Sequence, residues 1–332
     1  MLIRRQLPRR PWTPTSPSPQ RNGRPRPATD LEGRPTVLKR LFCLFLLCTA
    51  LPAAAWDNRG HRLTGELAYD RLQARDPAAV QAIVAIMARH PDRARFDRNL
   101  AGMSGEARTR RMFGLMARWP DDVRDTRWDR PDWHYALKVM HGWTWLDWYT
   151  AGKAEAQWAA NLASARSAAA PPEQRAVALC WLLHIGGDMH QPLHRGHRLD
   201  GTWLKSDRAG TIAYVRRGPG LPPMALHQLW DKAFDPTGVD GGDENGDVAR
   251  LHAAFAPREV AMAPDGNFAN WLDESEALAR ARGYTGPALR ATRAEAAAPP
   301  MTPAYMTMLR AIAERRVIAA GVRMGAALQG LR

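Results

Sequence analysis

The stretch "LLHIGGDMHQPLH" holds a dense group of side chains that could bind a metal ion. His184 and Asp188 are four residues apart, so on a helix both project from one face. His194 follows a proline that would end that helix, and "ALHQLWDK" repeats the spacing with His227 and Asp231. Imidazole and carboxylate are ligands that zinc accepts, and two donors one helical turn apart can share one ion. The repeated spacing predicts metal binding.

Two further groups of residues could complete such sites. The stretch "ARWPDDVRD" offers Asp121, Asp122 and Arg124, and "RPDWHYAL" offers His134 and Tyr135. Taken alone, the two acids are typical of a helix N-terminus, where the helix dipole favours negative charge. His134 taken alone is typical of a histidine packed among aromatic residues. A functional interpretation of these residues is supported only because the other motifs occur in the same chain.

The N-terminal part of the chain predicts a leader. Residues 41–51, "LFCLFLLCTAL", form an apolar run that follows two basic residues and precedes three alanines, the pattern of a cleavable signal. The run is shorter than the roughly 20 residues that span a bilayer. We interpret residues 37–55 as a signal peptide and residues 1–36, rich in Pro and Arg, as disordered or as an over-extended start. Export to the periplasm or secretion is expected.

Cleavage after Ala55 would leave Trp56 as the first residue, with His61 five residues later. The leader contains 10 of the 47 Lys and Arg but only 2 of the 33 Asp and Glu, so the mature part keeps a mild positive surplus. That surplus alone does not indicate a polyanionic partner. Cys180 is the one cysteine beyond the leader, which excludes an internal disulfide in the mature part. A hydrophobic core or metal ions must therefore hold the fold.

The mature part predicts one helical domain. Helical apolar spacing occurs at residues 77–90, 106–119, 145–165, 173–189, 269–282 and 303–331. The run 173–189 is apolar nearly all round, which predicts a central buried helix. Only residues 211–217 are typical of a strand, in a hairpin, and residues 216–223 are typical of a surface loop. We expect an all-α fold over residues 56–332, with at most a small β-hairpin.

The order of these motifs resembles the zinc-dependent S1/P1-type nucleases, a family of single-strand-specific nucleases and 3′-nucleotidases. The resemblance rests on W-x4-H at the predicted mature terminus, then W-x-D, W-H-[FY], H-x3-D-x5-H with "QPLH", L-H-x-x-W-D, and "WLDES" at residues 271–275. It implies a mainly helical trizinc fold. It also implies hydrolysis of single-stranded DNA and RNA to 5′-phosphate products, and hydrolysis of 3′-nucleotides.

Residue by residue, the resemblance implies nine metal-binding residues for three zinc ions. One zinc would be held by Asp121, His134, His184 and Asp188. A second, bridged through Asp188, would be held by His61 and by the freed amine and carbonyl oxygen of Trp56. The third would be held by His194, His227 and Asp231. In this interpretation, removal of the leader creates a metal ligand.

The resemblance also implies roles in catalysis. Asp121 would orient the attacking water or accept its proton. Arg124 would hold a phosphate oxygen by a paired hydrogen bond, and Tyr135 would stack on an unpaired base. The expected protein is a monomer that does not associate stably with membranes.

Some points stay open at the level of sequence. Asp122 is adjacent to Asp121, so that ligand assignment could be wrong by one residue. The stretch "DRAGT" at 207–211, preceded by the extra "HRLDGTWLKS", should border the cleft and leaves base preference undecided. The other histidines fit no ligand spacing and are expected at the surface or in packing; they are His90, His141, His190, His197 and His252.

Two alternative functions remain. A trizinc phospholipase C would share the helical fold and the N-terminal tryptophan ligand, but Asp231 and the 32 residues between His194 and His227 argue against it. A zinc-stabilised binding protein without turnover would keep the ligands and lose the open water site.

Overall fold

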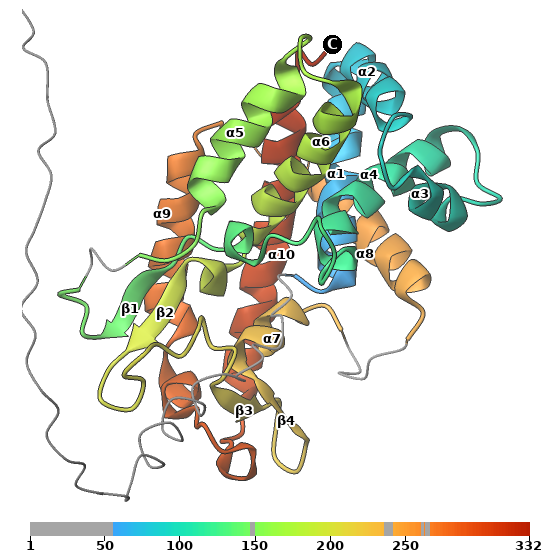
Figure 1. The fold of residues 1–332 in the computed structure, drawn as a ribbon. Helices are drawn as coiled ribbons and strands as arrows, with labels where there is room; N and C mark the ends of the chain where they lie inside the picture. Colours follow the sequence, from blue (N-terminus) through green and yellow to red (C-terminus); the bar gives the residue numbers. More distant parts are fainter. Residues whose placement is uncertain (1–55, 147–149, 236–241, 260–261, 263–265) are drawn as a thin grey trace, which may run out of the picture. The chain divides into compact units, whose positions relative to one another are not determined.

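The computed structural model describes residues 56–146, 150–235, 242–259, 262 and 266–332. The described residues form ten α-helices and two short pairs of strands (Figure 1). The helices are α1 (Asn58–Arg75), α2 (Pro77–Met87), α3 (Arg93–Asn99), α4 (Gly105–Asp122), α5 (Ala154–Arg166), α6 (Pro172–Asp188), α7 (Leu226–Asp231), α8 (Glu244–Glu259), α9 (Phe268–Leu278) and α10 (Pro303–Ala327). The expected mainly helical fold is confirmed. The predicted leader, residues 1–36 and 37–55, lies outside the described residues.

Helix α6 is the central buried helix that its apolar sequence predicts. Every residue from Ala178 to Asp188 is buried, and α6 contacts α4, α5 and α10 (Figure 1). Two glycines permit this close packing. A Cβ at Gly186 would lie 2.5 Å from Met324 Sδ on α10, and one at Gly187 would lie 3.2 Å from His61 Nδ1 on α1. The glycines therefore bring α10 and α1 against the end of α6.

Helix α1 is buried although its sequence is strongly polar. Arg59 Nε donates to Asp247 of α8 at 2.8 Å, and Arg62 Nη1 donates to Glu244 of α8 at 2.7 Å. Both arginines are less than a tenth exposed. Paired in this way, charged side chains can be buried at tolerable cost, and α1 packs against α4, α8 and α10.

The helix expected from residue 145 begins nine residues later, at Ala154. Ala151 instead pairs with Leu137 in an isolated bridge. Gly152 has φ +97°, and a Cβ there would lie 2.0 Å from the carbonyl oxygen of Tyr135. This left-handed, tightly packed glycine prevents the helix from starting earlier. Residues 147–149 of the expected helix lie outside the described part.

The described strands form two small two-stranded sheets. Strand β3 (Tyr214–Arg216) pairs antiparallel with β4 (Pro223–Ala225), which confirms the expected hairpin and its loop. Strand β1 (Lys138–Gly142) pairs in parallel with β2 (Gly196–Leu199). The expectation of a single hairpin was incomplete, because β1 and β2 are short and lie far apart in sequence.

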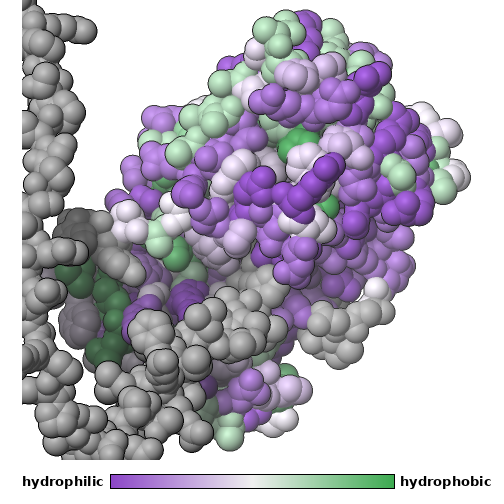
Figure 2. Space-filling model, in the orientation of Figure 1, coloured by the Kyte–Doolittle hydropathy of each residue, from purple (hydrophilic) through white to green (hydrophobic). Residues whose placement is uncertain are grey.

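The face of the molecule shown in Figure 2 is mainly hydrophilic, with apolar residues in small groups. None of the described helices combines the length and the hydropathy that crossing a bilayer requires.

Candidate metal centre

Three groups of histidine and aspartate lie in the interior, each with ligand atoms within 4.8 Å of one another. The groups are His61, Asp121 and His184; His134, His184 and Asp188; and His194, His227 and Asp231. Their members come from helices and turns that are distant in sequence. All eight side chains that the sequence analysis names as metal ligands are thus brought together.

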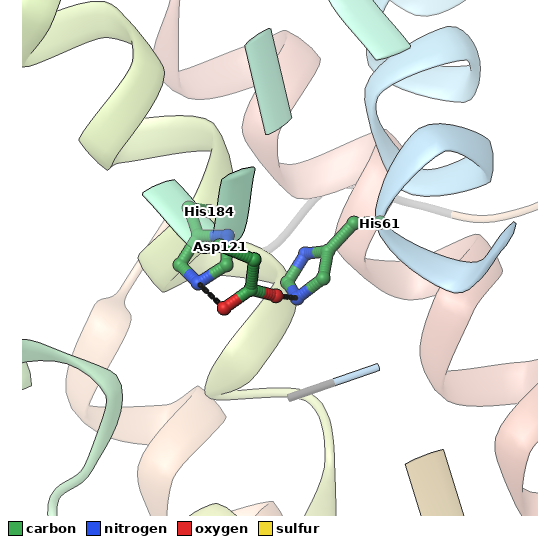
Figure 3. A group of neighbouring side chains, drawn as sticks. All are labelled: His61, Asp121 and His184. Atoms are coloured by element: carbon green, nitrogen blue, oxygen red, sulfur yellow. Dashed lines mark ion pairs between the residues drawn. The ribbon is translucent and has the colours of Figure 1, made fainter. Parts of the chain in front are cut away.

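Asp121, in the last turn of α4, lies between two imidazoles (Figure 3). Its Oδ2 is 3.6 Å from Nε2 of His61, and its Oδ1 is 3.8 Å from Nε2 of His184. The neighbouring Asp122 points elsewhere, since its Oδ1 accepts from Arg118 Nε at 2.8 Å. The geometry therefore favours Asp121 over Asp122 as the ligand.

Asp188, the last residue of α6, connects the first two groups. Its Oδ1 lies 3.3 Å from His61 Nε2, while its Oδ2 lies 3.1 Å from His134 Nδ1 and 3.3 Å from His184 Nε2. The carboxyl group is fully buried, and this burial raises its pKa well above the ordinary range. One carboxylate facing two sets of imidazoles is the arrangement that a bridging ligand needs.

The third group joins a short 3-10 turn, Pro192–His194, to helix α7. His227 Nε2 lies 3.7 Å from Asp231 Oδ2, and the rings of His194 and His227 are 4.7 Å apart. Gln191 Nε2 donates to Asp231 Oδ1 at 2.7 Å and holds that carboxylate in place. Nothing in the spacing of the motifs indicates this contact of Gln191, because it joins residues 40 positions apart.

Backbone carbonyls fix the tautomer of three of these histidines. The Nδ1 atoms of His184, His194 and His227 lie 2.7, 2.6 and 2.8 Å from the carbonyl oxygens of Ala117, His134 and Ala209. A carbonyl only accepts hydrogen bonds, so Nδ1 must carry the proton and Nε2 must carry the lone pair. Histidines that bind metals are commonly held in this way.

Several buried polar atoms of the groups have no hydrogen-bond partner among the described residues. They include His61 Nδ1 and Nε2, Asp121 Oδ2, His134 Nε2, Asp188 Oδ1 and His194 Nε2. Burial lowers the pKa of His61, His134 and His194 well below the ordinary value, so these rings are neutral. Buried lone pairs without donors are costly unless a cation satisfies them. Neutral imidazoles beside carboxylates fit zinc.

The family model of S1/P1 nucleases matches residues 56–331. The chain belongs to the S1/P1 nuclease family. Members of this family are zinc-dependent nucleases, so the chain is assigned as a hydrolase acting on nucleic acid. No curated protein matches the chain. In this S1/P1 nuclease the matched region begins at Trp56, the expected first residue of the mature part.

Trp56 of this S1/P1 nuclease is fully buried beside the groups. Its indole Nε1 donates to the carbonyl of Gly187 at 3.0 Å, next to Asp188. The backbone N–H of Asp57 donates to the carbonyl of Asp231 at 3.1 Å. The start of the matched region is thereby fixed against α6 and α7.

The two residues expected to contact substrate both contact members of the three candidate metal-binding groups. Arg124 donates to Asp121 Oδ1 through Nε at 3.0 Å and Nη2 at 2.5 Å. Tyr135 is half-buried and stacks on His194 with ring centroids 4.7 Å apart and an interplanar angle of 12°. One face of the Tyr135 ring is therefore covered by His194.

The remaining histidines lie outside the three groups. His141 is exposed, His252 pairs with Asp70, and the other three are buried in packing. His190, for example, lies 2.6 Å through Nδ1 from the carbonyl of Gly186 and contacts Arg323 through Nε2. The expectation of surface or packing roles holds for them.

Proposed function

We propose that this S1/P1 nuclease hydrolyses phosphodiester bonds of single-stranded DNA and RNA to 5′-phosphate products, and that it also hydrolyses 3′-nucleotides. The observation that carries the proposal is the shared position of Asp188 between His61 and the pair His134 and His184. Two metal positions joined by one carboxylate, with a third group nearby, suit a substrate that carries negative charge in its transition state.

We propose that three zinc ions are held by the nine residues that the resemblance implies. They are Trp56, His61, Asp121, His134, His184, Asp188, His194, His227 and Asp231. When bound, zinc supplies Lewis acidity and lowers the pKa of a coordinated water to about 7. The neutral imidazoles and the buried carboxylates described above support this assignment.

Asp121 and Arg124 act together in the proposed reaction. Asp121 orients the attacking water or accepts its proton, since its two oxygens face different partners. Arg124 holds one of those oxygens, and its guanidinium is placed to donate to a phosphate oxygen when substrate arrives. Tyr135 keeps its hydroxyl proton, because burial raises the pKa of that hydroxyl far above its ordinary value. Its ring could take a base only on the face opposite His194.

The cellular setting is part of the proposal. Export to the periplasm or outside the cell would remove residues 37–55 and free the amine of Trp56. The buried place of Trp56 beside α6 and α7 supports a defined, folded terminus at this residue. The protein would then work as a monomer without stable membrane association.

End-group analysis of a digested single-stranded oligonucleotide tests the proposal. Purified protein beginning at Trp56 is loaded with zinc and incubated with single-stranded DNA, single-stranded RNA, duplex DNA, a 3′-nucleotide and phosphatidylcholine. Products with a 5′-phosphate from the single strands, and release of phosphate from the 3′-nucleotide, support the proposal. Release of phosphocholine alone would indicate a phospholipase C. Turnover of none of these substrates by zinc-loaded protein would indicate a binding protein.

A further inference from the structure

The turn after α6 joins the candidate metal-binding groups to one another. Asp188 ends α6 and connects the first two groups, while Gln191 donates through Nε2 to Asp231 of the third group at 2.7 Å. Met189 and His190 lie between Asp188 and Gln191 and are fully buried. We call these two residues the 189–190 turn. Because the chain between Asp188 and Gln191 is so short, the conformation of this turn sets their spacing.

Side chains of α9 and α10 cap the carbonyl groups of the 189–190 turn. Carbonyl groups at the end of a helix lack partners within it. Met189 O accepts from Ser275 Oγ of α9 at 2.6 Å, and His190 O accepts from Arg316 Nε of α10 at 3.1 Å. Ser275 is fully buried, and Arg316 is only 5% exposed. The turn is thus held by buried donors from two other helices.

The side chain of His190 forms a second connection between this turn and α10. Its Nδ1 lies 2.6 Å from the carbonyl oxygen of Gly186, and its Nε2 lies 3.0 Å from Arg323 Nη1. A carbonyl only accepts hydrogen bonds, so Nδ1 carries the proton and Nε2 accepts from the guanidinium. Both ring nitrogens therefore have partners, and the ring connects the last turn of α6 to α10.

Glu274 of α9 holds both arginines. Its Oε1 and Oε2 accept from Arg323 Nη2 and Nη1, each at 2.7 Å, and Oε2 also pairs with Arg316 Nη1. Burial lowers the pKa of Arg316 to about 10, so its guanidinium stays charged at neutral pH. A buried charge is costly unless it is paired and hydrogen-bonded. Glu274 therefore allows Arg316 to lie as a cation at the end of α6, where the helix dipole favours positive charge.

The stretch "WLDES" supplies the other partners of these arginines. Arg316 Nη2 donates to Ser275 Oγ at 2.7 Å and to the carbonyl oxygen of Trp271 at 3.3 Å. The guanidinium of Arg323 lies over the Trp271 ring, 5.7 Å from its centroid. Trp271, Glu274 and Ser275 are not proposed metal ligands. Through the two arginines, all three nevertheless act on the end of α6.

We propose that Arg316 is a positioning residue for the candidate metal centre. By holding the 189–190 turn, it sets the spacing between Asp188 and Gln191. The proposal rests on the proposed zinc assignment. Distances from zinc to its ligands vary by only about 0.2 Å, so a shift of the turn would misplace Asp188 and, through Gln191, Asp231. Contacts that orient metal ligands contribute about 10–100-fold to metal affinity. The loss should affect ions in more than one group.

The test measures zinc affinity in Arg316→Met, which removes the guanidinium and keeps an apolar stem. Competition of the zinc-loaded protein with a chelator, without substrate, should show an affinity about 10–100-fold lower than that of the parent for at least two ions. Arg316→Lys restores the charge but not the fork of donors, so its affinity should lie between those of Arg316→Met and the parent. A side chain that only filled space would give no such recovery, because Met and Lys are similar in length.

Ser275→Ala is a milder variant that keeps Arg316 in place, so it should fold even if Arg316→Met does not. It removes the hydroxyl that donates to Met189 O. Its zinc affinity should fall about tenfold.

Leu309→Ala is the matched control for a loss of stability. Leu309 is also fully buried in α10, but it packs in a different part of the core from Met189. The variant should lower the unfolding temperature of the zinc-free protein, because it leaves a cavity. Its zinc affinity, measured where the protein is folded, should stay within about twofold of that of the parent.

Two results would overturn the inference while leaving the zinc assignment in place. The first is a parent that binds zinc and an affinity within about twofold of it in both Arg316→Met and Ser275→Ala. The second is a loss in Leu309→Ala equal to that in Arg316→Met, which would indicate a general loss of stability. A parent that binds no zinc would refute the zinc assignment and the inference together. None of these measurements uses nucleic acid, so their outcome does not depend on which substrate the protein cleaves.

Discussion

Nε2 of His61 lies 3.3 Å from Oδ1 of Asp188, and the other oxygen of the same carboxylate faces His134 and His184. Asp188→Ala should therefore remove two of the three proposed zinc ions. Because metal binding is coupled to folding, the variant should also lose thermal stability and all measurable turnover. Metal analysis and calorimetry of protein purified in zinc check this.

Asp122→Ala is the matched control for that variant. Asp122 contacts Arg118 and lies outside the three groups, so its removal should leave the zinc content unchanged. Full zinc content in Asp188→Ala would show that Asp188 is only structural.

The second prediction concerns the N-terminus. A zinc-bound nitrogen needs a lone pair, which an α-amine with a pKa of about 7.7–8.0 can provide, whereas the lone pair of an amide is delocalised. Protein that keeps one residue before Trp56 should bind one zinc fewer and cleave single-stranded DNA far more slowly than protein that begins at Trp56. Zinc content and initial rates of the two forms decide. Identical values in both forms would exclude the amine as a ligand.

The third prediction uses the glycine pair of α6. In Gly187→Ala the new Cβ would meet His61 Nδ1 at 3.2 Å and Thr64 Oγ1 at 3.4 Å, so the imidazole must move by a few tenths of an ångström. We expect weaker zinc binding with little change in the stability of the zinc-free protein, because alanine favours the helix by about 1 kcal/mol. Competition with a chelator measures the affinity.

Gly186→Ala is the natural comparison, because its Cβ would contact Met324 and Trp158 instead of a proposed metal ligand. It should cost about 1–3 kcal/mol of stability and keep the zinc affinity. Equal zinc affinities in both variants would refute the proposed role of Gly187.

The fourth prediction concerns acid stability. His90 is buried, which lowers its pKa to about 4 from the ordinary 6.5. Between about pH 6.5 and pH 4, His90 is protonated in the unfolded chain but neutral in the folded chain. The free energy of unfolding therefore decreases as the pH falls through this range. Between about pH 7 and pH 5 the loss should be about 2 kcal/mol.

His90→Asn tests the sign. Its side-chain oxygen can still accept from the N–H of Asp92, as His90 Nδ1 does at 3.0 Å, but it does not titrate. Urea unfolding at the two pH values should show a smaller pH dependence in the variant than in the parent. A slope equal to that of the parent would mean that His90 does not contribute.

The sequence predicted those elements whose burial is apolar. Helix α6 is apolar on nearly every side, and the structure buries it as expected. Helix α1 was missed because its buried face includes Arg59 and Arg62, which form ion pairs with α8. The spacing of apolar residues cannot predict a face that is buried through charged side chains. The β1–β2 pairing was missed because strands of four or five residues carry too little pattern for a long-range partner to be assigned.

For the candidate site, the sequence could name residues but not orientations. The spacing of His184 and Asp188 predicted a shared face, and the structure places them 3.3 Å apart. The sequence could not show that Arg124 forms an ion pair with Asp121, or that the ring of Tyr135 stacks on the ring of His194. Both contacts depend on side-chain rotamers in the folded protein.

The carbonyl groups that orient the histidine rings have a consequence for the order of events during folding. The acceptors of His184, His194 and His227 lie 67, 60 and 18 residues away along the chain. Each ring is oriented with Nε2 toward the candidate metal centre only after a separate long-range contact has formed. A fragment that begins after Ala209 could not orient His227, however much zinc is supplied. Zinc occupancy should therefore record the completion of tertiary structure, which makes metal content a sensitive measure of correct folding for variants whose substitutions lie away from the metal centre.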